Sequence, residues 1–363
     1  CVITAENAGF SATALGTDSS IGAYFGLRAA AGAQAAVTAT RVGAAAAISH
    51  GAQLALRPAL TIDKPAGTVQ DDVMIASIAA RPQTVTITPP AGWTLVLRVN
   101  QGAGTTNSLA IYRKVAGASE PARYTWVISA STGAAGGIQS FANVDTVNPI
   151  DVGTNLLDGQ NTPSGTAHST PNRTTSVPDT MLVTSHAYGS SGTWTETPLG
   201  SMAEGFDTAS LTPNAGAGIS IAGYRVIQAA AAATGAKTAT ATAAADTGNA
   251  HILALRPRVH HFAVSVAGGA AADTCTAKNI TITAQDVFNG TVTNYTGTIN
   301  ITTSTSHGDW SVVTANGVLA NGAADDGAAT YTFVAADAGV ITLALTNTHA
   351  DDLTVTVQDS TRP

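Results

Sequence analysis

The segment TVTITPPAGWTLVLRV at Thr84–Val99 carries the pattern on which the fold prediction rests. Apolar residues alternate with polar ones before the Pro-Pro-Ala-Gly turn, and Trp93 opens a second apolar segment after it. A period of two is typical of a β-strand that buries one face. The same pattern occurs in SLAIYRKV (Ser108–Val115) and YTWVIS (Tyr124–Ser129). Because such segments recur at short intervals between Gly, Pro and Asn, the sequence predicts an all-β protein of sandwich type.

The composition supports an all-β fold and excludes several classes of partner. Charged residues make up only 11% of the 363 residues, against about 25% in an average domain, and Thr, Ser, Ala, Gly and Asn replace them. Such residues suit sheet faces and turns better than the exposed face of a helix. The chain has 23 acidic and 16 basic residues, so its composition does not indicate a basic surface. We therefore expect no nucleic-acid partner. No apolar run reaches about 18 residues, so we expect no membrane span.

An internal repeat organises the chain. The string GAQLALRP ends at Pro58 and AHILALRP ends at Pro257, 199 residues later. Upstream, AYFGLRAAAGA (23–33) resembles GYRVIQAAAAA (223–233), and both lead into alternating Ala and Thr. The repeat predicts three units: residues 1–58 as the C-terminal part of an incomplete sandwich repeat, 59–257 as a complete sandwich of jelly-roll or concanavalin-like type, and 258–363 as an immunoglobulin-like (Ig-like) sandwich with about seven strands.

The first unit is too short to close a sandwich core of its own. Two alternatives remain open for residues 1–58. Either the chain is cut from a longer one, or these residues pair with strands of a neighbouring subunit through main-chain hydrogen bonds at a sheet edge. In both cases we expect that residues 1–58 do not form an isolated closed domain.

The two cysteines, Cys1 and Cys275, lie in different predicted units. A bridge within one chain needs Cα atoms within about 7 Å, which the intervening unit makes improbable. A disulfide between successive subunits would form in an oxidising compartment. Two further readings stay open: the partner of Cys1 lies elsewhere, or Cys1 is a lipidated terminus, although its place inside a repeat argues against the latter.

Few residues suggest a metal or an active site. Asp325 and Asp326 in NGAADDGAAT are weak candidates for calcium, which takes six to eight oxygen ligands, and the competing interpretation is that they cap a turn. His260 and His261 should point to opposite faces of a strand, so we expect no metal site from them. We recognise no catalytic constellation and no cofactor motif, and predict a non-enzymatic protein.

The four tryptophans are candidates for the core or for stacking on sugars. Trp126 lies in an alternating strand and is expected in the core. Trp194 lies in a Gly/Ser-rich loop, GSSGTW, and is therefore the candidate for an exposed glycan contact.

Several segments resemble a known family. TPPAGWTLVLRV, FANVDTVNPIDV and TGAKTATATAAADTGNAHILALRP, followed by VHHFAVS, are similar to large proteobacterial surface proteins, above all the MshQ-like proteins of the mannose-sensitive haemagglutinin pilus system. Residues 258–363 also resemble the Ig-like domains of invasins and intimins. The resemblance implies an extracellular, cell-surface location, a role in adhesion or pilus-associated assembly, and no enzymatic activity. It supplies no binding residues.

Three functions follow in order of preference. The first is a structural and adhesive segment or subunit of a cell-surface fibre, with copies of itself as partners through residues 1–58. The alternative is a carbohydrate-binding adhesin module without polymerisation, whose partners would be host or surface glycans. The third is a glycosidase on a concanavalin-like sandwich, which would need two facing carboxylates in a groove.

Overall fold

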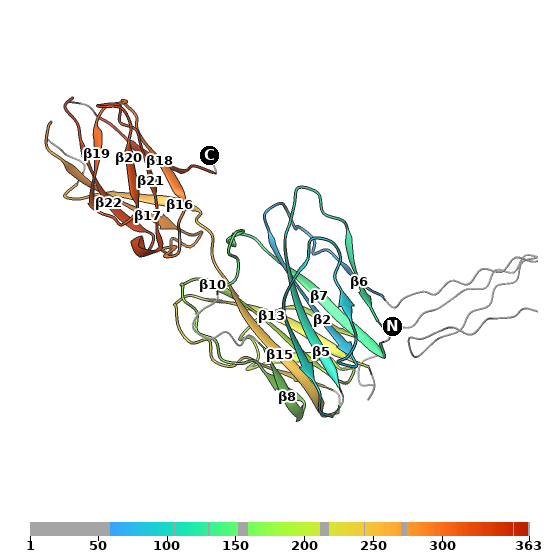
Figure 1. Cartoon of the computed structure of the whole chain (residues 1–363). Coiled ribbons are helices and arrows are strands. Elements are labelled where there is room, and N and C mark those ends of the chain that lie inside the picture. Colours follow the sequence, from blue (N-terminus) through green and yellow to red (C-terminus); the bar gives the residue numbers. More distant parts are fainter. Residues whose placement is uncertain are drawn as a thin grey trace, which may run out of the picture.

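The computed structural model describes residues 59–361 except 105, 130, 152–158, 211–217, 243, 270–273 and 351. This part of the chain forms six antiparallel sheets and one 3-10 turn, η1 (Ala335–Asp337), so the prediction of an all-β chain of tandem sandwiches is confirmed (Figure 1). None of its helical segments has the length and apolar character needed to cross a membrane. Cys1 and the predicted unit at residues 1–58 lie outside the described residues.

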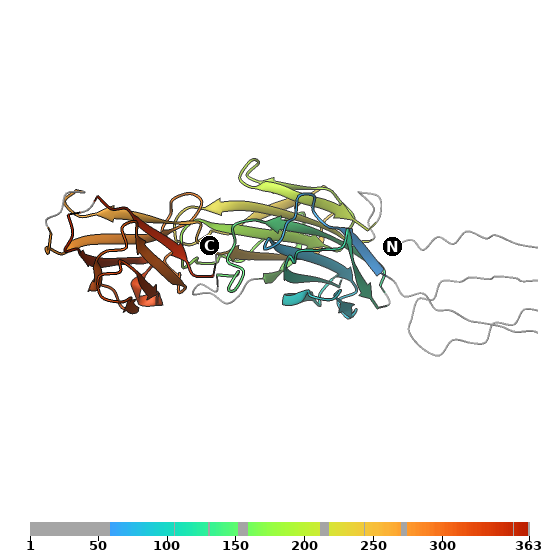
Figure 2. The ribbon, with the colours of Figure 1, turned by 90° about the horizontal axis from the view of Figure 1, so that it is seen from above.

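Residues 59–257 form a body of four stacked sheets, seen edge-on in Figure 2. The first outer sheet has the order β1 (Ala59–Asp63), β6 (Arg123–Ile128), β3 (Ile87–Thr88). The first inner sheet has the order β4 (Thr94–Gln101), β5 (Asn107–Val115), β2 (Val73–Arg81), β7 (Gly133–Phe141). The second inner sheet has the order β12 (Ala203–Ala209), β13 (Ser220–Gln228), β10 (Thr180–Tyr188), β15 (Asp246–Leu255), β8 (Gly159–Gly165). The second outer sheet has the order β11 (Trp194–Thr197), β14 (Thr238–Ala241), β9 (Ala167–Ser169).

Three apolar cores hold these four sheets together. In the first, Trp126 of the outer sheet packs against Met74 of the inner sheet. In the second, Ile75 and Leu109 of one inner sheet meet Leu253 of the other, so both faces of each inner sheet are covered. In the third, Trp194 packs with Tyr224 and its neighbours. Each aliphatic side chain fully buried in these cores contributes about 1.5–3 kcal/mol to the free energy of unfolding.

The body contains the same sandwich twice. Strands β4-β5-β2-β7 of the first inner sheet correspond in order and connection to β12-β13-β10-β15 of the second, and β1-β6-β3 correspond to β9-β14-β11. The sequence analysis expected one two-sheet sandwich at 59–257, whereas the structure has two that pack through their inner sheets. Continuous apolar runs such as VMIASIAA (Val73–Ala80) reflect this arrangement, because a strand covered on both faces loses the alternating pattern.

The Ig-like sandwich occupies most of the remaining described chain. One sheet has the order β16 (His261–Val266), β17 (Lys278–Gln285), β22 (Val340–Thr346), β19 (Asp309–Thr314). The other has the order β20 (Val318–Asn321), β21 (Ala329–Thr332), β18 (Thr298–Thr303), β23 (Val355–Asp359). Trp310, Tyr331 and Phe333 fill the core between them.

A short connection joins the Ig-like sandwich to the four-layer body. Arg258 N–H donates to the Asn143 carbonyl on the body side, and His260 N–H donates to the Gln285 carbonyl on the other. Asp179 approaches Asp286 across this junction, and burial together with the Asp286 carboxylate raises the pKa of Asp179. The chain is therefore tied down on both sides of the junction.

The two inner sheets approach closely at Gly137 on β7. A Cβ at this position would overlap the ring of Phe206 on β12, and a Cβ at Gly223 would meet the same ring. The ring thus fills the space that the two missing side chains leave. Only glycine at these positions lets the second core close around Phe206.

We expect Gly137→Ala to lower the free energy of unfolding by about 1–3 kcal/mol, because the ring of Phe206 must move in a close-packed core. Gly165→Ala is the matched control, since its Cβ would meet the nearest atom, the Ala167 carbonyl oxygen, at 3.8 Å. Urea denaturation of both variants measures the difference. Equal midpoints would contradict the close approach of the inner sheets at Gly137.

Candidate functional site

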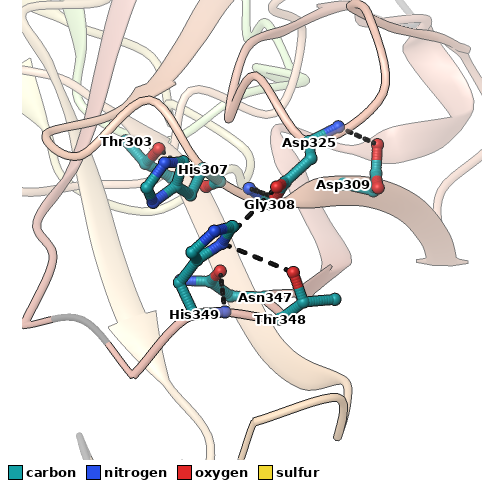
Figure 3. Close-up of polar contacts among 8 residues, drawn as sticks. All are labelled: Thr303, His307, Gly308, Asp309, Asp325, Asn347, Thr348 and His349. Atoms are coloured by element: carbon teal, nitrogen blue, oxygen red, sulfur yellow. Dashed lines mark hydrogen bonds and ion pairs between the residues drawn. The ribbon is translucent and has the colours of Figure 1, made fainter.

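Three loops at one end of the Ig-like sandwich bring together the polar cluster in Figure 3. Asp325 belongs to the β20–β21 loop, and its Oδ1 accepts the Gly308 N–H at 2.8 Å. Its Oδ2 lies 3.4 Å from Nδ1 of His349 in the β22–β23 loop. The rings of His307 and His349 stack at 3.8 Å with 17° between their planes. Asp309 completes the cluster by accepting the Asp325 N–H at 3.1 Å.

This cluster joins loops but does not form a recognisable metal centre. Stacked imidazoles direct their nitrogens within parallel planes, so the two rings do not converge on one ion. Among the described residues, no group of three or more His, Cys, Asp or Glu side chains is arranged to hold a metal.

Asp326, the neighbour of Asp325, points to a different set of partners. Its Oδ2 accepts the Ala323 N–H at 2.7 Å and its Oδ1 accepts the Ala328 N–H at 2.9 Å. These bonds close the turn between β20 and β21, as the capping interpretation expects. The two adjacent carboxylates therefore serve separate loops. The group was missed because His307 and Asp309 are far in sequence from both Asp325 and His349, and no local pattern links them.

Trp194 is buried, and the prediction of an exposed indole was wrong. Its side chain is only 3% exposed, and Nε1 donates to Ser220 Oγ at 3.1 Å. The Gly/Ser-rich segment before it leads directly into β11, whose inner face covers the second inner sheet. A ring enclosed in this way has no face to offer a sugar. Trp126, with 0% exposed, confirms the core prediction.

Cys275 is exposed and carries a free thiol in the described part of the chain. It lies just before β17 with a positive φ of 65°, and its N–H donates to the Asn347 carbonyl. A thiol in this position is accessible to a partner molecule. The predicted bridge to Cys1 involves a residue outside the described part and stays a prediction.

His260 and His261 differ from expectation. Their Nδ1 atoms lie 3.3 Å apart, although neighbours within a strand would point to opposite faces. The strand β16 begins only at His261, so the alternation rule does not apply to His260. Both rings lie at the junction between the body and the Ig-like sandwich.

The chain matches no family model, and neither the curated proteins nor the solved structures contain a significant match.

The buried carboxylates of the described residues hold turns together. They are Asp72, Asp151, Asp286 and Asp337. Each accepts at least one backbone N–H: from Val69, Ser176, Gly290 and Asn316, respectively. Burial of a carboxylate is tolerated when hydrogen bonds replace water. Their partners make these groups structural supports.

Three buried histidines lie inside the second sandwich. His186 Nδ1–H donates to the His168 carbonyl at 2.9 Å, and His168 lies 2.5 Å from Thr162 Oγ1 through its own Nδ1. Burial lowers the pKa of His168 to about 4 and that of His186 to about 3. It also lowers the pKa of His251 to about 3. All three imidazoles are therefore neutral in the folded protein at pH 7.

The neutral histidines predict an acid-sensitive fold. A histidine in the unfolded chain has a pKa of about 6.5. Below that pH each of these histidines is protonated in the unfolded state but stays neutral in the folded state. Stability is fully present above about pH 6.5 and is lost as the pH falls toward the folded pKa values. Between pH 7 and pH 5 we expect a loss of up to about 2 kcal/mol for each histidine.

Urea denaturation at pH 7 and pH 5 tests this expectation. His186→Gln should make the loss smaller, because one of the three titrating groups is removed. Ser220→Ala, which removes a buried hydroxyl of the same sandwich but no titrating group, is the matched control and should leave the loss unchanged. An identical loss in wild type and His186→Gln would contradict the assignment.

Proposed function

We propose that this chain is a structural and adhesive segment of an extracellular surface fibre or pilus-associated adhesin. The observation that carries the proposal is the tandem arrangement of sandwiches: one seven-strand topology occurs twice and is followed by an Ig-like unit. Repeated units that contact mainly their neighbours suit an extended spacer. The resemblance to MshQ-like surface proteins supports the same role. From it we infer an extracellular location and no enzymatic activity.

The outer faces of the sheets fit this role because hydroxyl groups replace charges on them. Pairs of Thr or Ser side chains hydrogen-bond across neighbouring strands in both outer sheets of the body and in both Ig-like sheets. These pairs are Thr61–Thr125, Thr193–Thr242, Thr197–Thr240, Ser169–Thr238, Thr281–Thr342 and Thr298–Thr332. Cross-strand pairs stabilise sheets by about 0.2–1 kcal/mol each. Such faces stay hydrated with little charge repulsion between adjacent molecules.

The repeat supplies a route to assembly. Residues 6–58 match the stretch that forms β12 to β15 in the complete unit. In that unit β10 lies between β13 and β15 in the sheet, so a sheet built from the equivalent segment would accept a strand equivalent to β10. Earlier residues of a longer chain or a second copy would supply it. We propose a second copy, through strand complementation.

Sedimentation velocity of the full chain tests this route. We expect the average sedimentation coefficient to rise with protein concentration, and electron microscopy to show end-to-end particles. Leu54, the sequence equivalent of the buried Leu253, should be buried at the contact. Leu54→Asp should therefore weaken association, whereas Leu199→Asp, the same change at a residue 83% exposed, should not. A single monomeric species at all concentrations would overturn the polymerisation proposal.

The exposed Cys275 allows a separate test of covalent linkage. If Cys1 and Cys275 of successive subunits join under oxidising conditions, non-reducing electrophoresis of the oxidised chain should show a ladder of multimers. Cys275→Ser should abolish the ladder, and a reductant should do the same to wild type. Only monomer in the oxidised wild type would remove the disulfide while leaving non-covalent assembly intact.

A further inference from the structure

A pocket of about 290 Å³ opens at the edge of the four-layer body, beside the connection to the Ig-like sandwich. Its lining consists of Arg113, Val147, Asn148, Pro149, Ile150 and Arg256. Four of these residues belong to the segment FANVDTVNPIDV, which no part of the proposed function uses. The volume is at the small end of the range for ligand sites, which suits one sugar residue or a group of similar size.

Arg113 brings an unpaired positive charge to this pocket. It shares a face of β5 with Leu109 and Ile111, which pack in the core between the inner sheets. The residue is partly buried, and its guanidinium makes no hydrogen bond or ion pair with the described residues. It is therefore available to pair with an anion bound in the pocket.

Arg256 adds a second guanidinium to the lining. Its Nη2 lies 3.4 Å from Oδ1 of the fully buried Asp151. Asp151 offsets one positive charge and also accepts hydrogen bonds from Ser176. The charge of Arg113 remains uncompensated, so the pocket is locally positive in a chain whose net charge is −7.

The other lining groups indicate the rest of the ligand. Val147 is 79% exposed, and together with Pro149 and Ile150 it provides an apolar wall. The exposed Asn148 amide has no partner in the described chain and can both donate and accept. An apolar wall, an amide and paired guanidiniums match a sugar ring that bears a carboxylate.

The backbone of the pocket argues against recognition of a peptide terminus. The N–H groups of Val147 and Asn148 both donate to Asp145 Oδ1, and the Arg256 N–H donates to the Pro149 carbonyl. A C-terminal carboxylate is commonly captured by free backbone N–H groups. Here the uncommitted donors are side chains, which form bidentate pairs with carboxylates in the case of arginine.

We propose that this pocket binds a single uronic acid residue of an acidic polysaccharide, with Arg113 and Arg256 on its carboxylate. The proposal does not depend on polymerisation of the chain. Binding should weaken as salt concentration rises, because the charges are only partly buried. A surface segment with this site would attach to acidic glycans rather than neutral ones.

Calorimetric titration of the full chain with galacturonic acid trisaccharide tests the proposal. Loss of a hydrogen-bonded charge pair should weaken binding about 10- to 100-fold in Arg113→Gln. Arg123→Gln is the control, because Arg123 is exposed on the outer sheet and pairs with Asp63. Val147→Glu places a competing carboxylate at an exposed position and should also weaken binding, without risk to the fold.

Three outcomes would overturn the proposal. Equal binding of the methyl ester of the same trisaccharide would show that the carboxylate is not recognised. Binding of a short peptide through its free C-terminus, without binding of the trisaccharide, would assign the pocket to peptides. No binding of the trisaccharide at millimolar concentration would remove the site, whatever sedimentation shows about assembly.

Discussion

The packing of the two inner sheets against each other is the contact on which the rest of this structure depends. It buries Ile75, Leu109 and Leu253 between the two sandwiches, so central strands such as β2, β10 and β15 have almost no contact with solvent. Polar groups on those strands then need internal partners, as in the Ser77–Ser185 hydroxyl pair at 2.7 Å. Burial on β15 also keeps His251 neutral. A change at this contact would therefore reach both halves of the body.

The outer sheets meet solvent together with edge strands of the inner sheets such as β4, and the outer sheets carry few charges. Alternation is restored there, as in the burial pattern of β6, and threonine occupies many of the outward positions. Hydroxyl pairs across the strands satisfy one another and still leave lone pairs for water. This explains how a chain with 11% charged residues can present large sheet faces.

The polar groups outside the sheets fall into two kinds. Carboxylates such as Asp326 and Asp337 close turns by accepting hydrogen bonds from backbone N–H groups. Their hydrogen-bonding capacity therefore serves the fold itself. Arg113 is different, because its charge has no partner among the described residues. An unpaired charge at a pocket is a local sign of a bound ligand. It distinguishes the pocket from the loop cluster around Asp325, whose donors and acceptors largely satisfy one another.

The sequence by itself determined the all-β class, the tandem organisation and the burial of Trp126, because strand periodicity and turn residues are local properties of the chain. Only the tertiary structure decided that residues 59–257 form two sandwiches rather than one, since the partner of an apolar face is set by long-range packing. The burial of Trp194 follows from that packing and overrode its Gly/Ser-rich context. The cluster at Asp325 and the pocket at Arg113 were invisible for the same reason. Their side chains come from loops and strands that are distant in sequence and meet only when the sheets have stacked.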